Sequence, residues 1–142
     1  MKSKGVFFAV IVLALAVFNA PAAFAGDLCS RLTEAEVSAA VGTQLQRSPT
    51  DPCRFGRGFK SIYITMHEGG GGQFDNYAGQ ARKEFPDVQV VPGIGSKAVF
   101  FGFNLAVQYK SDLFVVNVML GKGTPEKIAL AKAVAQKVIS HL

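Results

Sequence analysis

The chain of 142 residues contains no tryptophan, only two cysteines and two histidines, and no Asn-x-Ser/Thr acceptor site. Two cysteines 24 positions apart supply too few ligands for a zinc site, so we expect neither a metal nor a cofactor. The glycine run at 69–72 is not followed by Lys-Ser/Thr, which excludes a phosphate-binding P-loop. The sequence therefore lacks the familiar signatures of an enzyme.

An apolar run at residues 6–18 follows the basic Lys2 and Lys4 and precedes the small-x-small site Ala23-Phe24-Ala25. This pattern is typical of a cleaved signal peptide. We therefore expect residues 1–25 to be removed and residues 26–142 to form a single domain, soluble in the bacterial periplasm or secreted. The remainder has no second long apolar run, so we expect no transmembrane segment. Export also makes nucleic acids poor partners.

The charge balance is mildly basic. The full chain has a formal net charge of +5, and without Lys2 and Lys4 thirteen basic and ten acidic residues leave +3. A balance of this size favours loose contact with anionic surfaces, but it is too small to indicate a polyanion-binding protein.

Both cysteines, Cys29 and Cys53, lie in the expected mature domain, and an even pair in an oxidising compartment predicts a disulfide. Closing a loop of this length stabilises the fold by roughly 3 kcal/mol in the chain-entropy model. A lipid anchor on Cys29 is the alternative. It fits poorly, because Asp27 and Leu28 stand where a lipoprotein signal has small residues.

Three segments have helical signals. Thr33 and Glu36 predict a capping box for a helix that ends at Gly42. Apolar residues three and four apart predict a second helix over Gln73–Phe85, which Pro86 stops. A final helix is expected after Gly123, with Thr124 as its cap and Pro125 in its first position.

Alternation of apolar and polar residues predicts a half-buried strand over Phe59–His67, with Ile62, Ile64 and Met66 on the core face. Further strands are expected at Thr43–Arg47, Val88–Val91, Ala98–Phe103, Leu105–Tyr109 and Leu113–Leu120. The short connections between the last three predict an antiparallel meander. The expected fold is α+β, of order α-β-β-α-β-β-β-α, with about four to six antiparallel strands and helices packed mainly on one face.

Two surface clusters are candidate binding sites. Arg54, Arg57 and Lys60, with Phe55 and Phe59 between them, form a basic-aromatic patch suited to an acidic partner, a lipid headgroup or a glycan. The alternative is a solvated hairpin beside the disulfide. If helices cover one face of the sheet only, either Phe100 or the pair Phe101 and Phe103 faces outward and offers an aromatic contact; otherwise these rings lie under a helix or loop.

His67-Glu68, followed by the four glycines, is the remaining polar cluster. It could supply a general base or metal ligand, with Glu68 or Asp75 as its partner, and the glycine loop would admit substrate. The alternative is a strand that ends at the surface before a flexible connector.

Three segments together resemble the DUF3558 type of small exported bacterial proteins, many of which are uncharacterised lipoproteins or sensor-like domains. They are Cys29–Val37 with Ala40–Gly42, then Cys53–Phe55, then Val91–Ala98. The resemblance implies an α+β fold with a Cys–Cys bridge and transfers no catalytic residue. The chain departs from the pattern by lacking a lipobox, which favours a protein without a lipid anchor.

These observations favour a non-enzymatic exported domain that binds a small ligand or a protein partner in the cell envelope. Its candidate contacts are Arg54, Arg57, Phe100 or Phe101, and the glycine loop at 69–72. The alternative hypothesis is a small hydrolase or metal-dependent enzyme that uses His67 and Glu68. A secreted inhibitor or toxin-associated protein is a third possibility.

Overall fold

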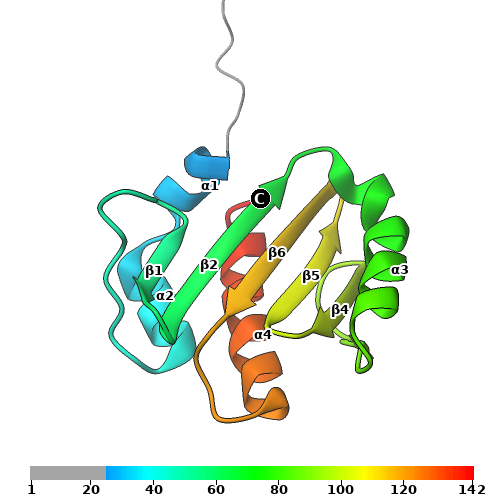
Figure 1. Cartoon of the computed structure of the whole chain (residues 1–142). Coiled ribbons are helices and arrows are strands. Elements are labelled where there is room, and N and C mark those ends of the chain that lie inside the picture. Colours follow the sequence, from blue (N-terminus) through cyan, green and yellow to red (C-terminus); the bar gives the residue numbers. More distant parts are fainter. Residues whose placement is uncertain (1–24) are drawn as a thin grey trace, which may run out of the picture.

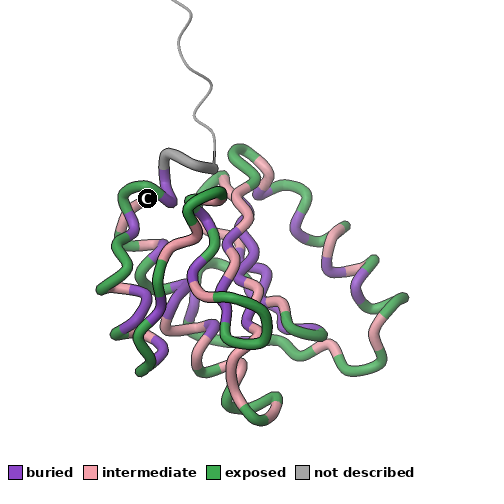
Figure 2. The backbone as a smooth tube through the Cα atoms, turned by 60° about the vertical axis from the view of Figure 1, so that its left-hand side comes forward, coloured by how far each residue is buried: buried purple, intermediate pink, exposed green. Residues whose placement is uncertain are grey.

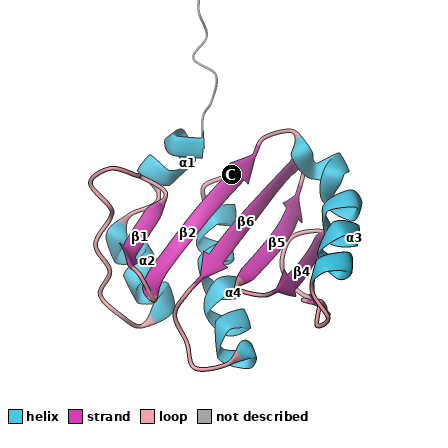
Figure 3. Ribbon diagram, viewed as in Figure 1, coloured by secondary structure: helices cyan, strands magenta, loops and turns pink. Residues whose placement is uncertain are grey.

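The structure is a computed structural model that describes residues 25–142, with side chains described from Leu28 onward. It confirms the α+β class: a six-stranded antiparallel sheet has helices packed against it (Figures 1 and 3). The expected signal peptide lies outside the described residues, except that Ala25 begins the first helix. Within the described part, no helix combines the length and apolar character needed to cross a membrane.

The sheet has the strand order β1-β2-β6-β5-β4-β3. The last strand in sequence, β6, therefore lies between the β1–β2 hairpin and the strands β5, β4 and β3. The strands are β1 (Arg54–Arg57), β2 (Lys60–His67), β3 (Gln89–Val90), β4 (Lys97–Phe101), β5 (Asn104–Tyr109) and β6 (Asp112–Val118). The helical elements are α1 (Ala25–Arg31), α2 (Glu34–Val41), the 3-10 turn η1 (Gly70–Gln73), α3 (Phe74–Glu84) and α4 (Thr124–Ser140).

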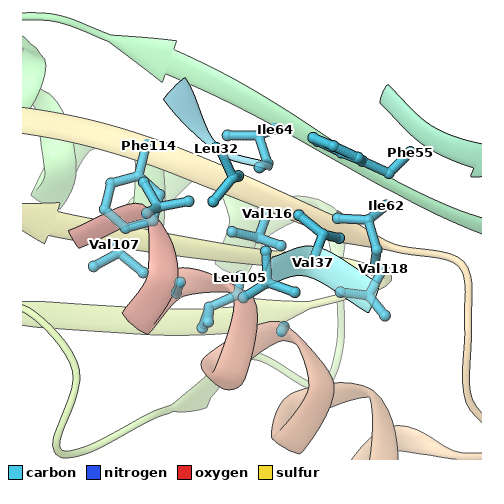
Figure 4. Packing of buried hydrophobic residues seen from close by; sticks show 14 of the residues in the cluster. Leu32, Val37, Phe55, Ile62, Ile64, Leu105, Val107, Phe114, Val116 and Val118 are labelled. Atoms are coloured by element: carbon cyan, nitrogen blue, oxygen red, sulfur yellow. The ribbon is translucent and has the colours of Figure 1, made fainter. Parts of the chain in front are cut away.

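One face of the sheet carries the larger core. Alternate residues of β2 and β6 point to this face, where Ile62 lies opposite Val118 and Ile64 opposite Val116. These four side chains are almost fully buried against α1, α2 and α4, as Figure 4 shows for part of the cluster. The predicted core positions Ile62 and Ile64 are confirmed, and Met66 packs against the same cluster while half-buried.

The opposite face is covered only in part, by α3. Apolar side chains of β4, β5 and β6 form a second cluster there with Phe74, Ala78 and Ala81 of α3. The prediction that helices pack mainly on one face therefore holds for α1, α2 and α4, and α3 is the exception (Figure 1). Figure 2 shows the buried stretches along the chain and the exposed segments that connect them.

The predicted capping box at the start of α2 is present. The Thr33 hydroxyl accepts from the Glu36 N–H at 3.1 Å, and the Thr33 N–H donates to the Glu36 carboxylate at 2.8 Å. Gly42 ends the helix at φ +69°. The Glu36 carboxylate also lies 3.0 Å from Nε2 of His141, beyond the end of α4. The backbone N–H of Thr33, helped by His141, lowers the pKa of Glu36 below its ordinary value.

The predicted disulfide joins Cys29 in α1 to Cys53, the residue before β1, with a Cα–Cα distance of 5.0 Å. Both cysteines are buried in the larger core. The bond ties the first helix to the base of the β1–β2 hairpin, and it is compatible with an oxidising compartment.

Two local predictions are wrong, and one helix was not predicted. Thr43–Arg47 is not a strand, because only Arg47 forms a bridge, to Phe55, and β1 takes the edge position. Thr124 is the first residue of α4 rather than its cap, which is Gly123 in an extended conformation. The helix α1 was not predicted, because its seven residues are too few to show a helical period.

Candidate functional site

A groove of about 790 Å³ lies between the β1–β2 hairpin and the segment 43–49. Its lining, which we call the basic groove, contains no acidic side chain and four basic ones: Arg47, Arg54, Arg57 and Lys60. The structure thus brings the two predicted arginine contacts, Arg54 and Arg57, onto one surface.

Arg47 holds the structure of the groove together. Its guanidinium donates to the carbonyl oxygens of Cys29 and Leu32 at the end of α1, and to that of Pro52 at 2.8 Å. Cys29 lies in the last turn of α1, where carbonyl groups lack a partner within the helix, and Leu32 follows the helix, so Arg47 caps this helix end. The guanidinium also lies 4.8 Å from the centre of the buried Phe55 ring. Because its guanidinium forms three hydrogen bonds to backbone carbonyl groups and lies against the Phe55 ring, we assign Arg47 a structural role.

The other three cations remain available. The side chains of Arg57 and Lys60 are exposed and form no hydrogen bond or ion pair with any other residue of the described range. Arg54 is exposed as well, and its guanidinium lies 4.9 Å from the centre of the Tyr63 ring, which orients it. Three positive charges without a carboxylate on the groove lining create an uncompensated positive potential, and arginine matches planar anions with two parallel hydrogen bonds.

Two glycines and a side-chain hydrogen bond fix the backbone conformation of the hairpin that carries these cations. Its loop has two residues, Gly58 and Phe59, with Gly58 at φ +53° as in type II′ turns. Gly56 has φ +82°, and a Cβ there would lie 2.0 Å from the Lys60 carbonyl oxygen, so only glycine fits. The Ser61 hydroxyl donates to the Gly58 carbonyl at 2.7 Å. The turn therefore presents its side chains from a fixed frame.

The outer edge of β1 is covered by the segment 46–48. The Gly56 N–H donates to the Gln46 carbonyl and the Ser48 N–H donates to the Arg54 carbonyl, both at 2.8 Å. These bonds make the segment one wall of the basic groove and shield the edge from pairing with other chains.

The structure contradicts the expected exposure of Phe100 and Phe101. Phe100 is buried in the larger core, and Phe101 is buried under α3, with its ring centre 5.8 Å from that of Tyr77 and 5.1 Å from that of Phe85. The condition for exposure was a sheet covered on one face, and α3 covers the other face at this point. Of the predicted pair Phe101 and Phe103, Phe103 alone is exposed, and the β1–β2 hairpin exposes Phe59.

His67 and Glu68 are both exposed at the end of β2. His67 lines a cavity of about 270 Å³ together with Tyr77 and three amide side chains from Gln73, Asn76 and Gln80. Burial raises the pKa of Tyr77. Glu68 does not line this cavity, and the His67 imidazole has no hydrogen bond or ion pair within residues 25–142. In the same range, no group of three or more His, Cys, Asp or Glu side chains is placed to hold a metal ion.

The segment Val91–Ala98, which carries part of the sequence resemblance, has a structural explanation. It lines a cavity of about 300 Å³ beside α3. A Cβ at Gly95 would lie 2.4 Å from the Gln108 carbonyl oxygen, and the Lys132 ammonium donates to the Pro92 carbonyl at 2.8 Å. The glycine and the loop shape are thus required by close packing against β5 and α4.

Sequence reasoning missed the segment 43–49 as part of the site. It expected a strand there, and the contribution of Arg47 depends on carbonyl groups 15 and 18 positions away. The only available signal was the basic-aromatic spacing of the hairpin itself, which did include Lys60.

Comparisons of this chain with family models, with curated proteins and with solved structures found no match. The resemblance to DUF3558-type proteins therefore stays a prediction from the three sequence segments.

Proposed function

We propose that this chain is a non-enzymatic, exported binding domain whose basic groove receives an anionic group of a small ligand or of a partner in the cell envelope. The observation that carries the proposal is the joint position of Arg54, Arg57 and Lys60 on one groove whose lining has no carboxylate. A free protein keeps such a cluster at the cost of charge repulsion, and an anionic partner relieves that repulsion.

The test is an NMR titration of the purified protein with two defined anions, inorganic phosphate and a hexaglutamate peptide. We expect amide shifts confined to 44–48 and 54–60. The variant Arg54→Gln/Arg57→Gln/Lys60→Gln should weaken hexaglutamate binding by at least about tenfold, because it removes the charges from the groove.

A matched control removes the same charge elsewhere. Lys83→Gln/Lys110→Gln/Lys137→Gln changes three exposed cations on α3, on the β5–β6 turn and on α4. This variant should bind almost as well as the unmodified protein. Equal losses in the two triple variants, or no shift in the groove, would refute the proposal.

The alternative function, a hydrolase or metal-dependent enzyme, has one supporting observation: His67 and the Tyr77 hydroxyl group share a cavity lining. It has less support than the binding function, because Glu68 does not join His67 there and no carboxylate lines that cavity. An ester or phosphoester hydrolysis that disappears in His67→Ala and persists in Glu68→Gln would establish His67 as a base that acts without Glu68.

A further inference from the structure

The most exposed large apolar side chain of the described residues is that of Phe59, which is 84% accessible. It occupies the second position of the two-residue turn between β1 and β2 and projects from the end of the sheet. Phe103, 46% accessible, has the same position in the turn between β4 and β5. The strand register places both turns at one end of the sheet (Figure 1).

Three cations lie close to Phe59 in the hairpin. Arg57 and Lys60 flank the Gly58–Phe59 turn directly, and Arg54 lies three residues farther along β1. No acidic residue occurs between Arg54 and Lys60.

The acidic residues at this end of the sheet lie beside the other turn. Glu84 ends α3, whose following residue Phe85 lies next to the glycine of the Phe103 turn. Glu126 lies in the first turn of α4, next to Lys127, and accepts from the Lys122 N–H at 2.8 Å. The Phe59 turn therefore has the more positive surroundings and the more exposed phenylalanine ring of the two.

We propose that the Gly58–Phe59 turn docks on the surface of an anionic lipid bilayer. The Phe59 ring enters the boundary between headgroups and acyl chains, while Arg57, Lys60 and Arg54 contact lipid phosphates. The proposal rests on the proposed function, because it names a bilayer as the carrier of the anionic group that the basic groove receives.

The shape of the turn favours a bilayer over a folded protein. A stable protein interface buries about 800 Å² on each partner around a packed apolar centre, and one projecting ring on a two-residue turn supplies only part of that centre. A bilayer needs no complementary pocket, and it combines a single inserted aromatic ring with positive charges at the headgroup level.

The absence of tryptophan makes a direct test available. Phe59→Trp places the only tryptophan of the chain at the turn, so its fluorescence reports on that site alone. With vesicles of mixed phosphatidylglycerol and phosphatidylcholine we expect a blue shift that salt weakens. With pure phosphatidylcholine vesicles we expect little shift, because the cations then have no anionic surface to bind.

Ser111→Trp is the matched control. Ser111 is exposed and holds the same second position of a two-residue turn, between β5 and β6, at the opposite end of the sheet. Its tryptophan should not shift with either vesicle. An equal shift at both positions would overturn the proposal, since it would indicate adsorption without a docking site.

Vesicle sedimentation of two further variants measures the apolar and the charged contributions to membrane binding separately. Phe59→Ser should weaken binding by about tenfold or more through the lost apolar contact. Arg57→Gln/Lys60→Gln should weaken it by about fivefold for each cation removed.

The outcomes distinguish this proposal from the proposed function. Hexaglutamate binding in the groove without any response to anionic vesicles would overturn bilayer docking and leave the anion-binding function in place. If the protein binds neither hexaglutamate nor anionic vesicles, both the anion-binding function and bilayer docking are overturned. Tight hexaglutamate binding that also shifts the emission of the Phe59→Trp variant, with vesicles inert, would assign the turn to an acidic protein segment instead.

Discussion

Two turns of the sheet share the dipeptide Gly-Phe and differ in their surroundings. Gly58 and Gly102 both have left-handed backbones, at φ +53° and φ +56°, as a two-residue hairpin loop requires. Phe103, however, is half as exposed as Phe59: the Lys127 ammonium lies 5.2 Å from its ring centre, and its carbonyl accepts from the Val118 N–H at 2.7 Å. The same local sequence therefore gives the same turn, and neighbouring elements decide what the turn presents to solvent.

The largest effect should come from removing the disulfide, which ties α1 to the start of β1, at the base of the hairpin that carries the Phe59 turn, and joins nothing in the β4–β5 hairpin. Cys29→Ala/Cys53→Ala is expected to lower the free energy of unfolding by about 3 kcal/mol in urea titrations. Hydrogen exchange should accelerate more in β1 than in the β4–β5 turn, because Cys53 immediately precedes β1. Equal acceleration at both turns would show that the bond stabilises the whole fold without a local preference.

Replacing Gly56 of β1 or Gly102 of the β4–β5 turn by alanine should destabilise the fold to a degree set by the space around each Cβ. Gly56→Ala is expected to cost about 2 kcal/mol, since its Cβ would meet the Lys60 carbonyl within 2.0 Å at φ +82°. Gly102→Ala should cost about 1 kcal/mol, because its Cβ would lie 3.0 Å from the flexible Phe85 ring. Thermal unfolding of the two variants measures the order, and a reversed order would contradict this packing account.

The two phenylalanines should differ in their contribution to stability. Phe103→Ser is expected to cost about 1 kcal/mol, through lost contact with Lys127 and the loss of half-buried apolar surface. Phe59→Ser should change stability by about 0.3 kcal/mol or less, since its ring contacts solvent almost entirely. A clear loss of stability in Phe59→Ser would show that the ring packs in the folded protein and is not held free for a partner.

The capping box of α2 lies far from both turns in sequence, and its effect on the pH dependence of stability is a reference for the variants of the turns. Glu36 contacts His141 after the end of α4, whereas the Phe103 turn contacts Lys127 near its beginning. Because the folded pKa of Glu36 is lowered, its stabilising contribution is complete above the ordinary carboxyl pKa of 4.5 and is lost as the pH falls through the folded pKa.

Glu36→Gln should therefore reduce the acid sensitivity of the unfolding free energy, by about 1 kcal/mol or less. The two serine variants of Phe59 and Phe103 should keep the sensitivity of the unmodified protein. A changed acid response in either of them would mean that a turn is coupled to the capping box.

A small gain in stability, opposite in sign to the losses above, should come from the third two-residue turn, between β5 and β6. Lys110 holds there, at φ +52°, the left-handed position that glycine holds in the other two turns. Lys110→Gly is expected to raise the free energy of unfolding by about 0.5 kcal/mol through relief of this strain. A loss of stability would show that contacts of the lysine side chain outweigh the backbone strain.

Much of the fold could be predicted from local patterns. Thr33, Glu36 and Gly42 specify both ends of α2 through groups within one or two helical turns, and the structure agrees at each position. The alternation of β2 predicted its buried face, because side chains of a strand point to opposite faces in turn. Such features depend on neighbours in sequence, so they are readable before the fold is known.

The candidate site was only partly predictable. The spacing of Arg54 and Arg57 indicated a basic patch, whereas the opposite wall of the groove comes from 43–49, held by Arg47 through distant carbonyl groups. The burial of Phe101 depended on α3 crossing the second face of the sheet, and no residue near Phe101 in sequence reports that crossing. Contacts of this kind join segments that are far apart in the sequence, so they produce no periodic pattern or fixed spacing of residues from which they could be predicted.

The sequence by itself determined the α+β class, the pairing of its two cysteines, the cap of α2 and the antiparallel meander of the last three strands, because each follows from chain composition or from groups a few residues apart. Only the tertiary structure decided which face each helix covers, and therefore that Phe100 and Phe101 lie in the cores while Phe59 projects outward. The physical reason is that exposure is a property of packed neighbours, and packing is settled by the whole chain.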